Sequence, residues 1–328
     1  KLQEDYMLDI KIHGLANSRF MAFDEDGFGL SSIPVPSSED LPMDLTVFLN
    51  TMNSMNFSNS VLVDCTASQD VADTYERVLA SKVAIVTPNK KANSSSLENY
   101  KSLKKLSGQR NIKFLYETNV AAGLPVISTL QDLILSGDKV IKIEGVLSGS
   151  MNYIFSELSK GTPFSEVVTQ AKEKGFTEPD PRDDLSGMDV ARKILILGRE
   201  AEQDLHFSDV SIQSMVPEDC QEIDSVEEFL EKLKGHDPHF KSLVDEAKEK
   251  EETLRFMAVL ENGKAEVGLK SVDKKHPFYS LEGSDNMILF TTERYHEFPM
   301  IIRGPGAGAD VTAAGVFADI IRLGNYSR

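Results

Sequence analysis

The sequence predicts an α/β fold: a Rossmann-like, doubly wound parallel sheet, followed by an α+β domain on a mostly antiparallel sheet. Three observations lead to this prediction. Short apolar strands alternate with amphipathic helices over the first third of the chain, which is typical of a parallel sheet covered on both faces. Two hairpin-like strand pairs occur late in the chain. With 328 residues, the chain is long for one hydrophobic core, so we expect two domains.

The first third contains four apolar segments that we expect to be strands, at residues 8–16, 60–68, 82–90 and 112–120. Helical patterns follow the last three, at residues 69–81, 96–107 and 124–137. In such sheets, ligands bind at the carboxyl ends of the strands. Those ends carry Thr66, then Asn89 and Lys90, then Glu117 to Asn119. A ligand site is therefore expected there; the alternative is a set of ordinary polar loops.

The chain opens with residues 1–8, "KLQEDYML", which look like the end of a helix. A dinucleotide-binding half normally begins with a strand and a Gly-rich turn that leads into a helix. No G-x-G-x-x-G motif precedes the strand at 8–16. We therefore expect the chain to start just after the phosphate-binding turn, so that the first strand and the turn are absent from it. Whether that turn was removed or lies upstream stays open.

The second part of the chain is expected to be α+β. A strand followed by a helix is predicted within residues 142–155, and the acidic stretch at 218–235 is typical of a solvated helix face. Two hairpins are predicted at 253–272, with Asn262-Gly263 at the turn, and at 287–304. A last helix at 311–323 follows the glycine cluster "RGPGAGAD" and is free to return to the first domain.

These elements predict two domains. We assign residues 1–135 to a nucleotide-binding domain, completed by the C-terminal segment 308–328. Residues 136–307 are assigned to a substrate-binding and dimerisation domain.

The composition excludes several classes of partner. A net charge of −17 argues against nucleic acid or an anionic membrane, because both would repel the chain. No long uncharged apolar stretch predicts a membrane span. Cys65 and Cys220, far apart, fit a reducing cytoplasm and offer neither a disulfide framework nor a thiolate metal site. His236 and His239 flank an Asp-Pro pair, which favours a surface turn over a metal site.

The densest motif is "GFTEPDPRDDLSGMDVARK", residues 175–193. Ser186, with Asp189 three residues later, resembles a capping box, so a helix should start near Gly187. The preceding segment is expected to be extended rather than helical, because it contains Pro179 and Pro181.

On the predicted helix, Asp189 and Lys193 are four residues apart and share a face. Apolar residues on nearly every side indicate that the helix is buried. Burial lowers the pKa of a lysine towards values useful for proton transfer. Lys193 with Glu178 and Asp184 would suit a substrate that carries an ammonium group and an oxygen to be protonated. The alternatives are a surface ion pair or a structural network.

With these residues in view, the sequence resembles the homoserine dehydrogenase family. The motif at 175–193 and the segments "VDCTAS", "VTPNKKANSS", "ETNVAAGLPV", "IEGVLSGSMNYIF" and "RGPGAGADVTAAGVFADIIR" resemble that family in the same order. The resemblance covers nearly the whole chain. It is closest to the homoserine dehydrogenase half of bifunctional aspartokinase–homoserine dehydrogenases, which implies an aspartokinase domain upstream in the same polypeptide.

The resemblance implies an NAD(P)(H)-dependent interconversion of L-homoserine and L-aspartate 4-semialdehyde, in threonine, methionine and isoleucine biosynthesis. It implies that Lys193 and Lys90 are catalytic at the substrate oxygen. The implied substrate-binding residues are Glu178, Asp184, Asp189, Gly149 and Ser150. The implied cofactor-binding residues are Thr66, Lys90, Gly175, Glu178 and Gly308. For Gly308 a plain helix-start turn competes with the cofactor role.

The family also implies a sodium-type ion, held by oxygens of Glu117, Val120, Ala122 and Leu124, with an ion-free structural loop as the alternative. Phe176 stands where relatives often have Tyr, so a hydroxyl contact is lost there. The strand at 8–16 ends without an acidic residue for a ribose hydroxyl. Asn17, Ser18 and Arg19 suit a 2′-phosphate better, which favours NADP(H) over NAD(H).

Two alternatives remain. One is a catalytically incompetent fragment of this enzyme, a dimerisation and substrate-binding half. The other is a semialdehyde dehydrogenase with Cys65 as thiol nucleophile, although no activating histidine lies near it in sequence. The strands before "RGPGAG" are plausible dimer strands, so a homodimer or higher homo-oligomer is expected. Threonine feedback would depend on upstream regions.

Overall fold

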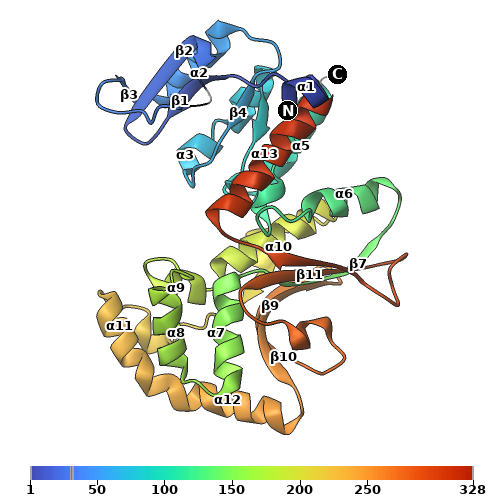
Figure 1. Ribbon diagram of the computed structural model, residues 1–328. Coiled ribbons are helices and arrows are strands. Elements are labelled where there is room, and N and C mark those ends of the chain that lie inside the picture. Colours follow the sequence, from blue (N-terminus) through green and yellow to red (C-terminus); the bar gives the residue numbers. More distant parts are fainter. Residues whose placement is uncertain (1, 30, 32, 327–328) are drawn as a thin grey trace.

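The computed structural model describes residues 2–29, 31 and 33–326. It contains two lobes: a three-stranded parallel sheet lies in the upper lobe of Figure 1 and a six-stranded sheet in the lower one. A third, small sheet stands beside the parallel sheet. The α/β class with a mostly antiparallel second sheet is as predicted. The division of the chain near residue 135 stays a prediction.

The chain starts with a short helix and a small antiparallel sheet. These elements are α1 (Leu2–Tyr6), β1 (Ile12–Ala16), β2 (Phe20–Phe28), β3 (Leu41–Pro42) and α2 (Leu45–Met55). The expectation that β1 belongs to the parallel sheet is wrong, because β1 pairs antiparallel with β2. The turn explains this pairing. The Asn17 carboxamide oxygen accepts from the backbone N–H groups of Arg19 (2.8 Å) and Phe20 (2.9 Å), which closes a hairpin between the two strands.

The parallel sheet has the order β4-β5-β6. Its strands are β4 (Val61–Val63), β5 (Ala84–Val86) and β6 (Phe114–Leu115), and its helices are α3 (Gln69–Ala72), α4 (Tyr75–Ala80) and α5 (Leu97–Arg110). The hydroxyl groups of Ser68 and Ser96 cap the starts of α3 and α5. Ile85 at the centre of the sheet packs in one core with Leu79 and Leu103 from the helices.

The remaining helices are α6 (Ile127–Leu135), α7 (Gly149–Lys160), α8 (Phe164–Glu173), α9 (Pro181–Leu185), α10 (Met188–Glu200), α11 (Val226–Leu233), α12 (Asp237–Glu249) and α13 (Ala309–Tyr326). The remaining strands are β7 (Val140–Val146), β8 (Val210–Ile212), β9 (Thr253–Glu261), β10 (Lys264–Val272), β11 (Asp285–Thr292) and β12 (Met300–Pro305). Five short 3-10 turns join them: η1 (Glu117–Asn119), η2 (Phe207–Asp209), η3 (Glu218–Cys220), η4 (Lys234–His236) and η5 (Pro277–Ser280).

The six-stranded sheet has the order β12-β11-β7-β9-β10-β8 and is antiparallel except for the β10–β8 pair. Both predicted hairpins are present, and Asn262 and Gly263 at the β9–β10 turn have positive φ. Helices α7, α8, α11 and α12 lie to one side of this sheet in Figure 1. Phe256 in β9 points into the main core, and its neighbour Met257 belongs to a second cluster on the opposite face.

The last helix, α13, lies with the upper lobe (Figure 1). Val316 and Leu323 pack against Val86 of β5. A Cβ on Gly324 would lie 2.5 Å from the Leu8 side chain, so the two ends of the chain are close together. Within the described residues, no helix combines the length and the apolar character needed to cross a membrane.

Two local predictions in the central motif are wrong. The segment after Pro179 is not wholly extended: Pro181 is the first residue of α9, where its missing N–H costs nothing, and Asp180 caps the helix. The capping box is also not formed. Gly187, with φ +74°, is the N-cap residue of α10, and no side chain caps that position. Only glycine adopts this backbone conformation readily, which is why the chain turns there.

Candidate active site

Lys193 lies at the centre of the candidate site. Helix α10 is almost entirely buried, and Lys193 on it is only 8% exposed. Its ammonium group contacts the Asp189 carboxylate one turn earlier at 2.7 Å, as the spacing predicts. It also donates to the backbone carbonyl oxygen of Leu147 at 2.7 Å. An ammonium has three donors, so these two contacts leave one for a further acceptor.

A second lysine shares the same carboxylate. Lys90 follows β5, and its Nζ lies 3.5 Å from Asp189 Oδ1. Burial lowers the pKa of Lys90; the attraction of Asp189 opposes this shift, and the nearby charge of Lys193 adds to it. Desolvation alone would raise the pKa of Asp189, but the charges of Lys193 and Lys90 outweigh it and hold that pKa well below its usual range. Asp189 is therefore an anion between two lysines.

The second carboxylate of the site, Asp184, is held differently. Its oxygens accept from the Ser150 hydroxyl at 2.6 Å and from the Glu178 backbone N–H at 2.8 Å. Desolvation raises the pKa of Asp184; the two hydrogen bonds oppose this shift, and repulsion from Asp189 adds to it. Ser150 is further held by the Ser148 hydroxyl at 2.8 Å. The site thus contains one carboxyl group whose pKa is lowered, Asp189, and one whose pKa is raised, Asp184.

The loop between β7 and α7 brings these groups together. Leu147 at its start accepts the hydrogen bond from Lys193, and Ser148 caps α7 through the N–H of Met151. Gly149 is required for close approach, because a Cβ there would lie 2.8 Å from the carbonyl oxygen of Ser284.

The expected cofactor residues come from three further segments. Thr66 follows β4 and donates its N–H to Asp64 at 2.8 Å. Gly175 (φ +68°) follows α8, and Gly308 (φ +111°) precedes α13. No atom lies within 4 Å of a Cβ built on Gly308, so there is open space before the first turn of this 18-residue helix. Among residues 2–29, 31 and 33–326, no hydrogen bond or ion pair joins these three residues to the two lysines.

The sequence analysis missed a buried network behind Lys90. Asp64 Oδ2 accepts from the Tyr75 hydroxyl (2.5 Å) and from the Asn89 carboxamide (2.9 Å). The Thr87 hydroxyl accepts from the Asn89 N–H at 2.9 Å. These bonds fix the loop that carries Lys90. A signal was present, since Asp64 is a charged residue directly after the apolar run Val61–Val63.

The proposed ion loop has a well-defined shape. Ala121 and Ala122 both have positive φ, which turns the chain sharply between Glu117 and Leu124. The Glu117 carboxylate is occupied: it accepts from the N–H of Ile127 at 2.6 Å and from Arg322 at 3.0 Å. An ion here would therefore be held by backbone carbonyl oxygens, which hard cations accept as ligands.

Cys65 does not have the character of a catalytic thiolate. Desolvation and the charge of Asp64 raise the pKa of its thiol. A thiol kept protonated is a poor nucleophile. The semialdehyde dehydrogenase alternative loses its support here.

The fold and the lysine–carboxylate centre together define the class of this protein: an α/β protein with a nucleotide-binding type of parallel sheet and a second, mostly antiparallel sheet. A family profile described as "Homoserine dehydrogenase" matches residues 125–321, and one described as "Homoserine dehydrogenase, NAD binding domain" matches residues 2–117. The chain belongs to the homoserine dehydrogenase family.

Individual relatives agree with this placement. The chain is 46% identical over 329 residues to the chloroplastic bifunctional aspartokinase/homoserine dehydrogenase of Daucus carota, covering 99% of this chain and 36% of that protein. It is 46% identical over 274 residues to the homoserine dehydrogenase of Schizosaccharomyces pombe, covering 80% of this chain and 72% of that protein. The solved structure of a hyperthermophilic archaeal homoserine dehydrogenase in complex with NADPH has a similar fold, with a TM-score of 0.62 and 24% identity, covering 81% of this chain and 72% of that one.

Proposed function

We propose that this chain interconverts L-homoserine and L-aspartate 4-semialdehyde with a nicotinamide cofactor. The observation that carries the proposal is Lys193, a buried ammonium held by Asp189 and the Leu147 carbonyl with one donor left over. The cofactor supplies the hydride when it is bound. Lys193 gives a proton to the aldehyde oxygen in reduction and takes it back from the hydroxyl in the reverse direction.

The other site residues hold and orient the substrate. Asp189 keeps Lys193 in place, and Lys90 faces the same oxygen from the strand edge. Glu178 is exposed, its backbone N–H contacts Asp184, and the two carboxylates bind the ammonium of the amino acid. Gly149 and Ser150 approach the substrate through the backbone and the hydroxyl. Thr66, Lys90, Gly175, Glu178 and Gly308 form the cofactor side of the site.

We further propose that NADP(H) is preferred over NAD(H). The Asn17 side chain is committed to the turn and to the carbonyl oxygen of Pro36 (2.7 Å). Ser18 and Arg19 lie in the β1–β2 turn outside the parallel sheet; their exposure is what supports a contact with a 2′-phosphate. The NADPH of the archaeal structure supports the same choice.

The finer proposals concern assembly and surroundings. An aspartokinase domain in the same polypeptide is proposed from the carrot relative.

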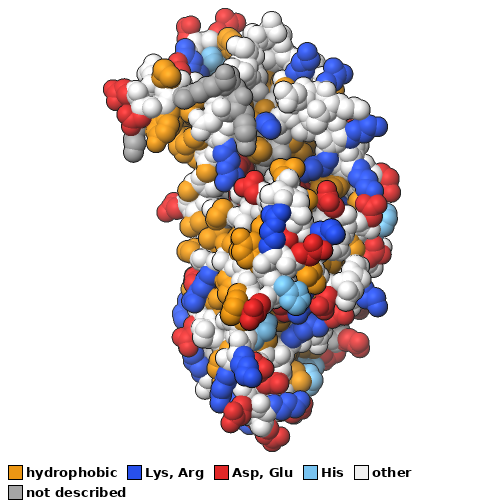
Figure 2. All heavy atoms as spheres, turned by 90° about the vertical axis from the view of Figure 1, so that its right-hand side faces the viewer, with side chains coloured by type: hydrophobic (Ala, Val, Ile, Leu, Met, Phe, Trp, Pro, Cys, Tyr) orange, Lys and Arg blue, Asp and Glu red, His pale blue; other side chains and the backbone are white. Residues whose placement is uncertain are grey.

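A homodimer is proposed from β12, which is an edge strand. Ile301 in this strand (48%) and Phe298 just before it (77%) are exposed. The face in Figure 2 shows hydrophobic side chains gathered at mid-height among mixed acidic and basic ones.

A reducing compartment, the cytoplasm, is proposed because Cys65 and Cys220 are free thiols.

The decisive experiment is homoserine-dependent reduction of NADP⁺ by this chain, followed by absorbance. Turnover that is faster with NADP⁺ than with NAD⁺ would support both the reaction and the cofactor choice. Repeating the assay with potassium in place of sodium would test the ion loop at Glu117, Val120, Ala122 and Leu124. No turnover would favour the incompetent-fragment alternative, and the reaction would then stand only if added upstream sequence restored activity.

A further inference from the structure

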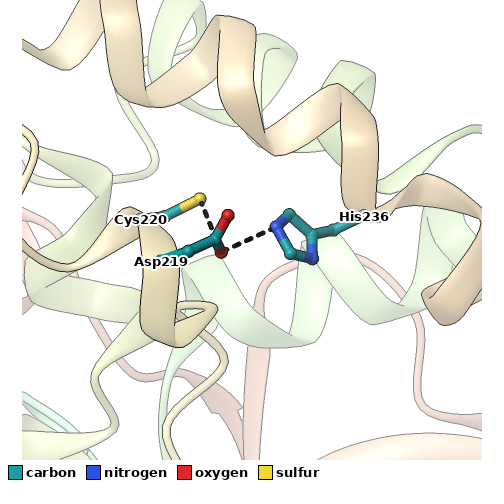
Figure 3. A group of neighbouring side chains, drawn as sticks. All are labelled: Asp219, Cys220 and His236. Atoms are coloured by element: carbon teal, nitrogen blue, oxygen red, sulfur yellow. Dashed lines mark hydrogen bonds and ion pairs between the residues drawn. The ribbon is translucent and has the colours of Figure 1, made fainter.

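Three side chains outside the candidate active site converge between two short turns. Asp219 and Cys220 belong to η3, and His236 ends η4. Figure 3 shows Asp219 at the centre, with Cys220 on one side and His236 on the other. Asp219 Oδ1 lies 2.9 Å from His236 Nε2 and 3.7 Å from Cys220 Sγ, and all three donor atoms lie within 4.8 Å of one another.

These separations suit a tetrahedral cation. Zinc binds sulfur at about 2.3 Å and nitrogen or carboxylate oxygen at about 2.0–2.2 Å, so its ligand atoms stand roughly 3.3–3.8 Å apart. The Asp219–Cys220 separation lies in this range, whereas Asp219 and His236 stand at hydrogen-bond distance and would move apart to bind an ion. A set of one thiolate, one imidazole and one carboxylate is typical of zinc rather than of calcium or magnesium, which prefer oxygen.

The cluster lies at the boundary between the core and solvent. Cys220 is fully buried, whereas the side chains of Asp219 and His236 are 53% and 30% exposed. Lys232 contacts the other carboxylate oxygen, Asp219 Oδ2, at 3.1 Å. That contact holds the carboxylate so that Oδ1 faces Cys220 and His236, and a bound cation would replace the contacts that Oδ1 now makes with both.

We propose that Asp219, Cys220 and His236 form a zinc-type cation site with water as the fourth ligand. On binding, the Cys220 S–H bond breaks, its proton leaves to solvent and a metal–sulfur bond forms. The ion would fasten η3 to the far end of α11, apart from the Lys193 centre.

The test is metal content of the full chain without an affinity tag, loaded with Zn²⁺ and then desalted. We expect about one zinc per chain, and Co²⁺ should give a thiolate charge-transfer band. Cys220→Ser and His236→Gln should each weaken zinc binding by about tenfold or more. His236→Gln keeps a donor for Asp219 on an exposed turn, so it reports binding even if Cys220→Ser folds poorly.

Matched controls use the other members of the same residue types. Cys65→Ser and His239→Gln should retain the zinc, because neither residue belongs to the cluster. The proposal is overturned if the wild-type chain retains no zinc, or if Cys220→Ser and His236→Gln retain as much as the controls.

Discussion

At the scale of single residues, the site depends on how one buried lysine is satisfied. The spacing of Asp189 and Lys193 was enough to predict their contact, because helix geometry places residues four apart on one face. The Leu147 carbonyl could not be predicted, since it lies 46 residues away in sequence and meets Lys193 only through tertiary packing. The hydrogen bond between Ser150 and Asp184 could not be predicted either, because these two residues also meet only through tertiary packing.

Replacing Lys193 with Ala should lower kcat by about 100-fold or more, with a smaller change in KM, because the proton donor is lost and the substrate contacts remain. Steady-state kinetics measure both constants. Lys101→Ala is the matched control, since Lys101 forms only an exposed pair with Asp204. Near-wild-type turnover of the Lys193 variant would contradict its catalytic role.

Glu178→Gln should act mainly on binding. Removing one carboxylate charge beside Asp184 should raise KM for homoserine by about tenfold or more with little change in kcat. Glu173→Gln, on an exposed part of α8, is the control. Equal KM values for the Glu178 variant and wild type would remove Glu178 from the ammonium site.

The lowered pKa of Asp189 predicts how the free energy of unfolding depends on pH. Its pKa is depressed in the folded chain, so the carboxylate stabilises the fold above its unfolded pKa of about 3.9, and this contribution is lost as pH falls towards the folded pKa. Asp189→Asn should therefore lower the free energy of unfolding at pH 7, and the difference from wild type should shrink below about pH 4. Denaturant titrations of the variant and of wild type, at pH 7 and below about pH 4, measure this difference in the free energy of unfolding. A difference independent of pH would mean that packing, not charge, is responsible.

At the scale of elements, turn chemistry decided where the sequence reading succeeded and failed. Asn262-Gly263 predicted the β9–β10 hairpin, because both residues tolerate positive φ. The prediction that β1 joins the parallel sheet is wrong, because Asn17 forms a hairpin turn there. The prediction of an extended segment at Pro181 is also wrong, because proline is favourable at the first position of a helix. In both cases the local sequence, at Asn17 or at Pro181, is compatible with two different backbone structures.

Gly149 links an element to the site, since it is the first residue of α7. Gly149→Ala should lower the free energy of unfolding by about 1–3 kcal/mol and reduce activity, because the added Cβ collides with the Ser284 carbonyl. Thermal denaturation and kinetics measure the two effects. In contrast, Gly108→Ala in α5 meets no atom within 4 Å and should be neutral or stabilising. Similar stability of both variants would refute the close-packing argument.

At the scale of the whole molecule, the upper and lower lobes are joined by buried polar contacts as well as by apolar packing. Glu200 at the end of α10 accepts from the hydroxyls of Tyr100 (2.7 Å) and Tyr116 (2.5 Å), and from Gln131 (2.6 Å). Lys104 lies 3.1 Å from the same carboxylate. These partners come from α5, from the residue directly after β6 and from α6, so Glu200 ties α10 to the parallel-sheet region. The strand and helix patterns in the sequence predicted both sheets. They did not predict the contacts of Glu200 that join the two lobes.

Glu200→Ala should lower the free energy of unfolding by about 3 kcal/mol, because it leaves two buried hydroxyls and an ammonium without their acceptor. Chemical denaturation measures the loss. Glu249→Ala, at an exposed position of α12, is the control and should change stability by less than about 0.5 kcal/mol. A loss no larger than that of the control would show that the lobes are held by apolar packing alone.

The order of strands in the large sheet also bears on how the chain folds. β7 lies between β11 and β9, so residues Val140–Val146 find both of their neighbours only after Thr253 and Asp285 have been made. Until then the central strand has two unpaired edges, and pairings between distant segments form slowly. On the ribosome, the parallel sheet can assemble early, whereas the six-stranded sheet must wait until β11 and β12 have been made. The second half of this chain is therefore the part that most needs protection from aggregation while it is being synthesised.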